Sequence, residues 1–320
     1  MSWKNFIQEY DGFEGVGHLH VLSNLYDKSS CLNATSKYIN YGCFDRYSCI
    51  VIALRRVMEV PRLKWESLIY EDPEGGKIVI WPHLPCVVMP NSLRYKKWDG
   101  LALLYSKDDV AILKEEDKDE IKSPGINVEA VLSSGGTMSL LLRDIQSLDV
   151  NGPSIPDPEP IRLLKHAENT GGKPVYTIIP EITDNNWEEW YSKCADNQVK
   201  LINLLKTINK SRRYTKNRLK ASKNVEISEK VNSELGAAAA ACASWWIEEQ
   251  RVLTEDLIKE RDERFAARIK GALFDLRNRR LDESNVSDVT LLVPVHQAYL
   301  EQLYNSLNRS DKVEKIERGR

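Results

Sequence analysis

The sequence predicts an α/β protein with a mixed central sheet, long C-terminal helices and an active-site end formed by strand termini. Apolar runs of strand length, separated by turn residues, occupy much of the first hundred residues. From residue 187 onward the pattern is helical, and a strand-like run returns at residues 289–295. Because that late run is rich in branched residues, it is typical of a buried strand, so both ends of the chain can share one sheet.

The expected strands of the first part of the chain are short. Residues 16–22 form a candidate strand, and residues 68–70 and 77–81 form an expected hairpin across the Pro-Glu-Gly-Gly turn at 73–76. Residues 100–113 carry apolar side chains on both sides of Lys107-Asp108-Asp109, which suits two strands around a turn. The charged stretch 114–122 is expected to be an exposed loop or a helix end.

The remaining elements are expected to be mainly helical. We expect a single α/β domain over residues 1–320, with its best internal boundary in the proline-rich segment 151–160. The helical region covers residues 187–282: one helical pattern at 187–208, preceded by Asp184 as a cap, and two long helices within 225–281. A helix over residues 296–307 follows the last strand.

Composition and charge limit the class of protein. Apolar residues make up 42% of the 320 residues, charged residues 29%, and the net charge is -2. These values are typical of soluble globular proteins and argue against a dedicated nucleic-acid or anionic-membrane binder, so any basic surface must be local. We find no signal peptide and no apolar run long enough for a membrane span. The six scattered cysteines suit reduced thiols, and a cytoplasmic location is expected.

Histidines near both ends of the chain are the main functional lead. His18 and His20 alternate within Gly17-His18-Leu19-His20-Val21, and His296 ends the apolar run that begins at Leu291. If both runs are strands of one sheet, their imidazoles can meet at its edge and form a metal or acid/base site. Histidines at strand ends also serve structural roles, and this alternative stays open.

Three further side chains are candidates for chemistry. Glu71 and Glu181 each follow an expected strand, and ligands of open α/β sheets collect at the carboxyl ends of strands. Ordinary turn chemistry is the competing interpretation for Glu71. Arg261 lies at the border of the apolar stripe of its helix, so its guanidinium requires either a structural carboxylate or a substrate anion.

The segment 210–223 contains seven basic residues and no acidic one. Such a segment could neutralise phosphates and bind nucleic acid in a salt-sensitive way. A solvated segment between helices is the commoner explanation, so nucleic-acid binding is a secondary hypothesis.

The order of these features resembles the TraB/PrgY/GumN family, whose relatives include the TIKI metalloproteases and, more distantly, erythromycin-esterase and ChaN-like proteins. The resemblance rests mainly on residues 257–269, a helix with an Arg-Asp pair at Arg261, followed by a strand that ends in His296. Residues 17–21 are similar to the family's first Gly-x-x-His motif, and residues 68–73 and 172–181 are similar to its strands that end in glutamate. Together these fragments cover about a quarter of the chain.

The resemblance implies a metal-dependent hydrolase, with peptidase activity as one form of it. His20 and His296 would bind a divalent transition metal such as Mn, Co or Zn, Glu71 or Glu181 would act as ligand or base, and Arg261 would stabilise an anion. The substrate would be a small molecule or a peptide, and the chain could form a homo-oligomer. The second motif departs from the family pattern, because Val293-Pro294-Val295-His296 lacks the expected glycine. A catalytically inactive protein with an interaction or regulatory role is therefore the alternative.

Overall fold

The computed structural model describes residues 60–281 and 289–316, in which five strands form one mixed sheet. The strands are β1 (Leu68–Glu71), β2 (Lys77–His83), β3 (Gly100–Leu103), β4 (Val175–Thr177) and β5 (Thr290–His296). Their order in the sheet is β1-β2-β5-β3-β4. Strand β1 is antiparallel to β2, whereas β2, β5, β3 and β4 run parallel to one another. The last strand of the chain therefore completes the centre of the sheet, and the predicted α/β class with a mixed sheet is confirmed.

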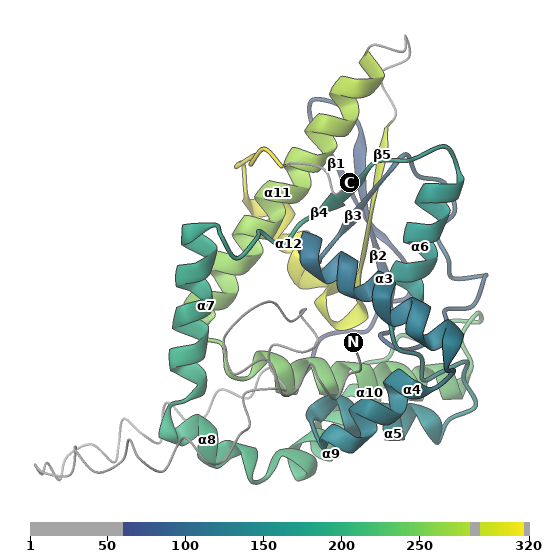
Figure 1. The fold of residues 1–320 in the computed structure, drawn as a ribbon, viewed down its shortest axis with the longest axis vertical. Coiled ribbons are helices and arrows are strands. Elements are labelled where there is room, and N and C mark those ends of the chain that lie inside the picture. Colours follow the sequence, from purple (N-terminus) through teal and green to yellow (C-terminus); the bar gives the residue numbers. More distant parts are fainter. Residues whose placement is uncertain (1–59, 282–288, 317–320) are drawn as a thin grey trace, which may run out of the picture.

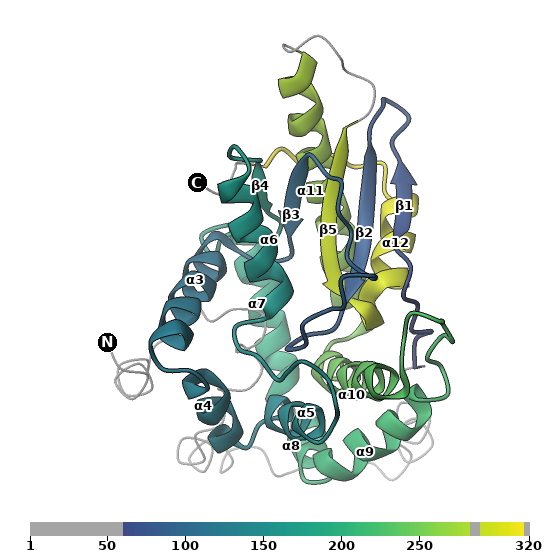
Figure 2. The same cartoon turned by 90° about the vertical axis from the view of Figure 1, so that its right-hand side faces the viewer.

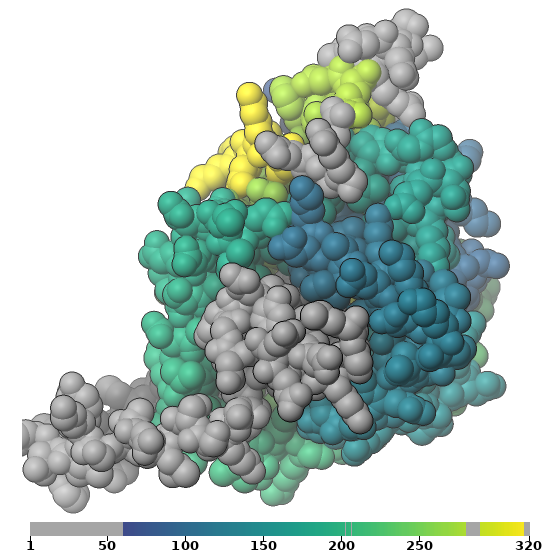
Figure 3. Space-filling view, viewed as in Figure 1, coloured from purple at the N-terminus to yellow at the C-terminus, as the bar shows by residue number. Residues whose placement is uncertain are grey.

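Helices cover both faces of this sheet (Figures 1 and 2). Helices α11 (Glu255–Leu281) and α12 (Leu300–Arg309) pack on one face, and α6 (Pro158–Asn169) packs against β3 on the other. Strand β5 is buried along almost its whole length because helices lie on both of its faces. In the space-filling view, the blue and teal residues of the helices that follow β3 form most of the visible surface (Figure 3).

A second group of helices lies beyond the carboxyl ends of β2 and β5 (Figures 1 and 2). Its members are α4 (Ile126–Ser134), α5 (Thr137–Gln146), α8 (Leu201–Thr207), α9 (Lys210–Ala221) and α10 (Ser233–Gln250). Helix α7 (Asn185–Gln198) connects the two parts and packs on α11. Five alanines of α10, at positions 238–241 and 243, are almost fully buried, because small side chains let the helix backbone approach α5 and α9 closely. The long C-terminal helices expected from the sequence are confirmed as α10 and α11.

The prediction of two strands over residues 100–113 is wrong for its second half. Only β3 is extended, and α3 (Lys107–Lys122) starts where the turn was expected. The cause is a capping box, in which the Ser106 hydroxyl accepts from the Asp109 amide at 3.1 Å and the Asp109 carboxylate accepts from the Ser106 amide at 3.0 Å. The charged stretch 114–122 continues this helix, where Lys114 pairs with Glu168 of α6 at 2.7 Å.

The proline-rich segment 151–160, expected as a boundary, is packed into the molecule. The Ser154 amide donates to the Cys86 carbonyl at 2.9 Å, and the Val88 amide donates to the Asn151 carbonyl at 2.8 Å. At Gly152 an added Cβ would lie 2.7 Å from the Cys86 carbonyl oxygen, so only glycine permits this approach. The segment thus lies against the loop that follows β2 and ends at the first turn of α6.

Residues 1–59 lie outside the described part of the chain, and with them the expected strand at 16–22. Within residues 60–281 and 289–316, none of the helices combines the length and apolar character that crossing a bilayer requires.

Candidate metal centre

Two neighbouring strands bring two histidines together at one end of the sheet. His83 is the last residue of β2 and His296 the last residue of β5, and the two are paired in register. Side chains in register on adjacent strands point to the same face, so the rings lie with centroids 5.3 Å apart. The site lies at the carboxyl ends of the parallel strands, the end of the sheet at which the sequence predicts an active site.

A carboxylate from a third element completes the cluster. Asp157 is the N-cap residue of α6, and its Oδ2 lies 3.6 Å from Nδ1 of His83. One ligand atom from each of His83, Asp157 and His296 can be chosen so that all three atoms lie within 4.8 Å of one another. Among the described residues, these three form the one histidine, cysteine and carboxylate cluster compact enough for a metal ion.

The polar atoms of this cluster are buried and poorly satisfied. Nδ1 of His83, Nδ1 of His296 and both carboxylate oxygens of Asp157 make no hydrogen bond of normal length and angle among the described residues. The backbone of Glu159 and Cys86 approaches the Asp157 carboxylate, and the backbone of Leu84 approaches His83. Leaving a buried donor or acceptor unpaired costs about 1–3 kcal/mol each, so such atoms in one cluster are unusual in a purely structural core. The arrangement is typical of a binding site whose ligand supplies the missing interactions.

Burial determines the protonation of all three groups. It lowers the pKa of His83 from 6.5 to about 4 and that of His296 from 6.5 to about 3, with a small contribution from the facing His83 ring in the second case. Burial, together with the nearby Glu159 carboxylate, raises the pKa of Asp157 well above 3.8. The histidines are therefore neutral at neutral pH, which is the form of imidazole that binds metals. A bound cation would reverse the effect on Asp157 and favour its carboxylate form.

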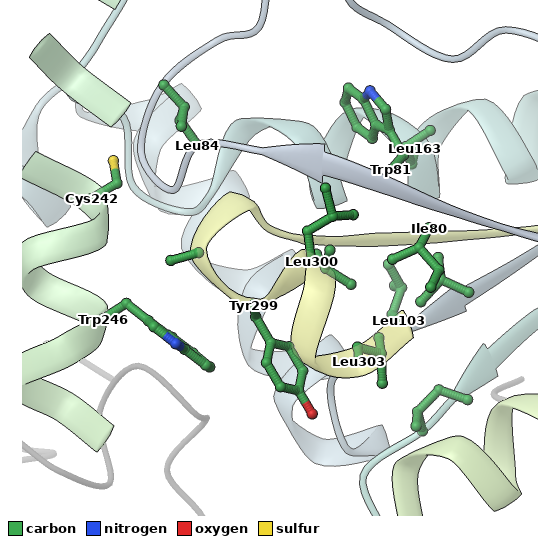
Figure 4. Close-up of a cluster of buried hydrophobic side chains, with 14 of the residues drawn as sticks. Ile80, Trp81, Leu84, Leu103, Leu163, Cys242, Trp246, Tyr299, Leu300 and Leu303 are labelled. Atoms are coloured by element: carbon green, nitrogen blue, oxygen red, sulfur yellow. The ribbon is translucent and has the colours of Figure 1, made fainter. Parts of the chain in front are cut away.

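A small cavity of about 50 Å³ adjoins the two histidines. Most of its wall is apolar or aromatic, with Trp245 and Trp246 from α10 and Tyr299 from the turn after β5. The Trp246 side chain extends toward the Tyr299 ring in Figure 4, and the two ring centroids lie 5.1 Å apart. Both tryptophan rings also contact His296, at 5.4 and 5.5 Å between centroids. This aromatic wall limits the access of water to the cluster.

Arg261, predicted as a site residue, lines the same cavity from α11. It is 1% exposed, and its Nε and Nη2 donate to Asp262 Oδ1 at 3.0 and 2.8 Å. Nη1 donates to Gln250, and the guanidinium carbon lies 5.1 Å from the Tyr299 ring centroid. Asp262 also accepts from the Tyr299 hydroxyl at 2.6 Å. Asp262 is thus the structural carboxylate, one of the two partners expected for Arg261 from the sequence, and Arg261 also presents a positive charge to the cavity.

Glu249, from the last turn of α10, supplies a further carboxylate to the cavity wall. Burial raises its pKa from 4.5 to about 7, against the opposing effect of a hydrogen bond with the Thr137 side chain. A carboxyl group with a pKa near neutrality can both accept and donate a proton at physiological pH. Glu249 is therefore a candidate acid/base group of the cavity.

The structure separates the residues that the sequence proposed for this site. His296 and Arg261 line one cavity, whereas His20 lies outside the described residues. Glu181 follows β4 at the same end of the sheet but lies beside α3, where burial and the Asp108 carboxylate raise its pKa. Glu71 lies at the opposite end, paired with Lys77 at the start of β2, because β1 runs antiparallel to its neighbour. The carboxyl end of an antiparallel edge strand meets the amino ends of the parallel strands.

Sequence reasoning missed His83 and Asp157, although each carries a signal. The expected strand at 77–81 stops before Pro82, yet proline is tolerated at a strand end, and an apolar run that ends in Pro-His resembles the run ending at His296. Asp157 precedes Pro158, a pair typical of the N-cap and first position of a helix. Glu249 has no comparable signal, because its position depends on how α10 packs.

The basic segment 210–223 forms α9 and the turn after it. Two of its basic residues make ion pairs within the molecule: Arg213 with Glu248 at 3.0 Å and Arg218 with Asp144 at 2.6 Å. Tyr214 is buried and donates to Asp144 at 3.0 Å. One face of this segment therefore anchors the helix, and only the opposite face is available to a partner.

Comparisons with protein-family models, with curated proteins and with solved structures each found no match for this chain.

Proposed function

We propose that this protein is a metal-dependent hydrolase whose divalent cation is bound by His83, Asp157 and His296. The observation that carries the proposal is the cluster of four buried polar atoms on these three side chains that make no hydrogen bond of normal geometry among the described residues. Two imidazoles and one carboxylate are a donor set that Zn²⁺, Mn²⁺ and Co²⁺ accept. The ligand atoms of one tetrahedral ion lie roughly 3.3 Å apart, so metal binding requires these side chains to move closer than their present separations of up to 4.8 Å.

The site offers three protein ligands, which is the number typical of catalytic metal sites. Structural zinc sites use four protein ligands, whereas catalytic sites use three and keep a position for water or substrate. When bound, such an ion lowers the pKa of a coordinated water and polarises the substrate carbonyl. Among the described residues that line the cavity there is no serine, threonine or cysteine, so the site favours activated water over a covalent nucleophile.

The other cavity residues have complementary roles in this proposal. Glu249 accepts a proton from the attacking water and returns it to the leaving group, as its pKa of about 7 allows. Arg261, held by Asp262, presents its guanidinium to the negative charge that develops on the carbonyl oxygen. Trp245, Trp246 and Tyr299 exclude bulk water, which strengthens both interactions. The substrate is an ester or amide, and peptidase activity is the narrower form of the proposal.

Metal analysis of the purified protein tests the proposal. The unmutated chain should bind about one equivalent of Zn²⁺, Mn²⁺ or Co²⁺ after dialysis, since a site with three protein ligands holds a single ion. The double variant His83→Ala/His296→Ala should bind none at this site. His166→Ala provides a matched control, because His166 is exposed on α6 and should leave metal binding unchanged. An unmutated protein that retains no transition metal would contradict the proposal.

The small size of the cavity favours one alternative, a metal-binding protein without catalytic activity that acts through interaction or regulation. A volume of about 50 Å³ admits a few waters or a small planar group, and Pro294 and Val295 form part of its wall. This alternative predicts metal binding without turnover. Hydrolysis of an ester or peptide library by the unmutated protein, lost in His83→Ala and retained in His166→Ala, would exclude it.

A further inference from the structure

Helix α8 exposes an apolar stripe to solvent. Leu201, Leu205 and Ile208 are 71%, 55% and 77% exposed, although leucine and isoleucine are usually buried. At 100° per residue these three positions fall within about 60° of one another, so they form one line along the helix. Asn203, on the opposite side of α8, is buried and donates to the Asn197 carbonyl at 2.7 Å. We call Leu201, Leu205 and Ile208 the apolar stripe.

Helix α9 follows after Asn209 and exposes a basic stripe. Arg212, Lys216, Lys220 and Lys223 are exposed, and their positions fall within about 80° of one another on the helix and its continuation. Leu219, 60% exposed, lies on the same side. We call these four cations the basic stripe.

Within the described part of the chain, the acidic partners of α9 bind arginines that lie outside the basic stripe. Arg213 pairs with the buried Glu248 of α10, and Arg218 pairs with Asp144 of α5. No Asp or Glu occurs between Asp196 and Glu226, so no acidic residue interrupts the two stripes along the chain. Each of the two consecutive helices therefore exposes one stripe, apolar on α8 and basic on α9.

The two helices lie at the end of the molecule away from the sheet in both ribbon views (Figures 1 and 2). This position is suited to contact with an extended surface. It is also separate from the cavity beside His83 and His296, because none of the stripe residues lines that cavity.

From this juxtaposition we propose that α8 and α9 dock the protein on an anionic lipid bilayer. Leucine and isoleucine on one short helix can insert at the boundary between head groups and acyl chains, while the adjacent basic stripe contacts anionic head groups. A nucleic acid would use the cations but would leave the apolar stripe in water. In a symmetric dimer of this chain the two basic stripes would lie near each other and repel. A bilayer can contact both stripes, the apolar one through its acyl chains and the basic one through its anionic head groups.

Co-sedimentation of the full chain with lipid vesicles tests the proposal. We expect binding to vesicles of phosphatidylcholine mixed with phosphatidylserine, weak binding to phosphatidylcholine alone, and a decrease in binding as salt is raised. Leu205→Ser/Ile208→Ser should reduce partitioning about tenfold or more, because both side chains lose their apolar burial in the membrane. Lys216→Gln/Lys220→Gln should reduce partitioning about 30-fold. Each basic residue near an anionic membrane contributes about 1 kcal/mol, and about 1.4 kcal/mol corresponds to a tenfold change in partitioning.

The controls use substitutions of the same kind elsewhere. Ile121→Ser removes an isoleucine that is 70% exposed on α3 and should leave partitioning unchanged. The test variants change exposed residues, and unaltered metal content and far-UV circular dichroism would show that they are folded.

Three outcomes would overturn the proposal. The first is equal or absent sedimentation with both kinds of vesicle. The second is salt-sensitive binding to an RNA or DNA oligonucleotide without vesicle binding, which would assign the basic stripe to nucleic acid. The third is a dimer of the unmutated protein, detected by light scattering, that is absent in Leu205→Ser/Ile208→Ser and that persists when vesicles are added.

Discussion

At the residue scale, the candidate site depends on three polar side chains that the fold buries without satisfying. His83 and His296 are neutral because burial lowers both pKa values, and burial favours the protonated form of Asp157 by raising its pKa. Each shift reflects the absence of a compensating charge, which is the property that a bound cation would supply. The same shifts have measurable consequences in the metal-free protein.

Replacing His296 by asparagine should change how stability depends on pH. Burial lowers the pKa of His296 from 6.5 to about 3, so between these values the unfolded chain binds a proton that the folded chain does not. The contribution of His296 to the free energy of unfolding is constant above pH 6.5. It decreases as the pH falls from 6.5 toward about 3, by roughly 1 kcal/mol per pH unit. Urea unfolding of metal-free protein across this range should give a slope for His296→Asn that is shallower by that amount. His166→Asn, which changes an exposed ring, should retain the unmutated slope. Parallel curves for His296→Asn and the unmutated protein would contradict the assignment.

Replacing Asp157 by asparagine should separate metal binding from stability. A protonated carboxyl and an amide have nearly the same shape, and the carboxylate oxygens of Asp157 make no hydrogen bond of normal geometry among the described residues, although the backbone of Glu159 and Cys86 approaches them. Asp157→Asn should therefore change the stability of the metal-free protein by less than about 1 kcal/mol. It should weaken metal binding on the order of 100-fold or more, because loss of a ligand exceeds the roughly 10–100-fold cost of losing an outer-shell partner. Titration calorimetry and urea unfolding measure the two effects. Unchanged metal affinity in a folded Asp157→Asn protein would remove Asp157 from the site.

At the scale of elements, the site is assembled by strand ends, one helix start and two buried helices. Strands β2 and β5 carry the histidines, α6 carries the aspartate, and α10 and α11 carry Glu249 and Arg261. The packing of α11 depends on the Arg261–Asp262 pair, which is buried together with the Tyr299 hydroxyl.

Removal of the Asp262 carboxylate should destabilise α11. In Asp262→Ala the Arg261 guanidinium, 1% exposed, would lose the acceptor of its Nε and Nη2 donors. An uncompensated buried charge costs about 3–5 kcal/mol, which should appear in urea unfolding. Glu263→Ala is the matched control, since the adjacent Glu263 is partly exposed and its pair with Lys259 lies at the surface. Similar small losses in both variants would show that Asp262 does not hold Arg261.

A substitution in the proline-rich segment should disturb the position of Asp157. In Gly152→Ala the added Cβ would meet the Cys86 carbonyl oxygen at 2.7 Å, and backbone there has little room to shift. We expect a loss of about 1–3 kcal/mol together with weaker metal binding, because the same segment leads into α6. Gly236→Ala, whose Cβ would make an ordinary contact at 3.6 Å inside α10, should be neutral or stabilising. Equal effects of the two substitutions would contradict this account.

At the scale of the whole molecule, sequence patterns predicted the helices and strands better than they predicted which of them are adjacent in the fold. The hairpin of β1 and β2, the long helices α10 and α11 and the late strand β5 follow from turn residues, helical spacing and branched side chains. A strand was expected where α3 forms. The capping box at Ser106 starts a helix there, because its local hydrogen bonds outweigh the apolar pattern.

The candidate site could be predicted only in part for a related reason. His296 and Arg261 lie in elements that the sequence identifies, but their partners depend on strand order. His83 lies beside His296 because β5 pairs with β2. Glu71 lies at the opposite end of the sheet because β1 is antiparallel to β2. Neither fact is encoded in local periodicity, which specifies which face is buried but not which strands are adjacent.

Anomalous X-ray diffraction from crystals of the protein grown with Zn²⁺ or Co²⁺ would show whether His83, Asp157 and His296 bind one metal ion. We expect one strong peak at the carboxyl ends of β2 and β5, within about 2.0–2.2 Å of a nitrogen of His83, a nitrogen of His296 and an oxygen of Asp157. Crystals without a peak between these side chains, or with the ion bound only elsewhere, would contradict this expectation.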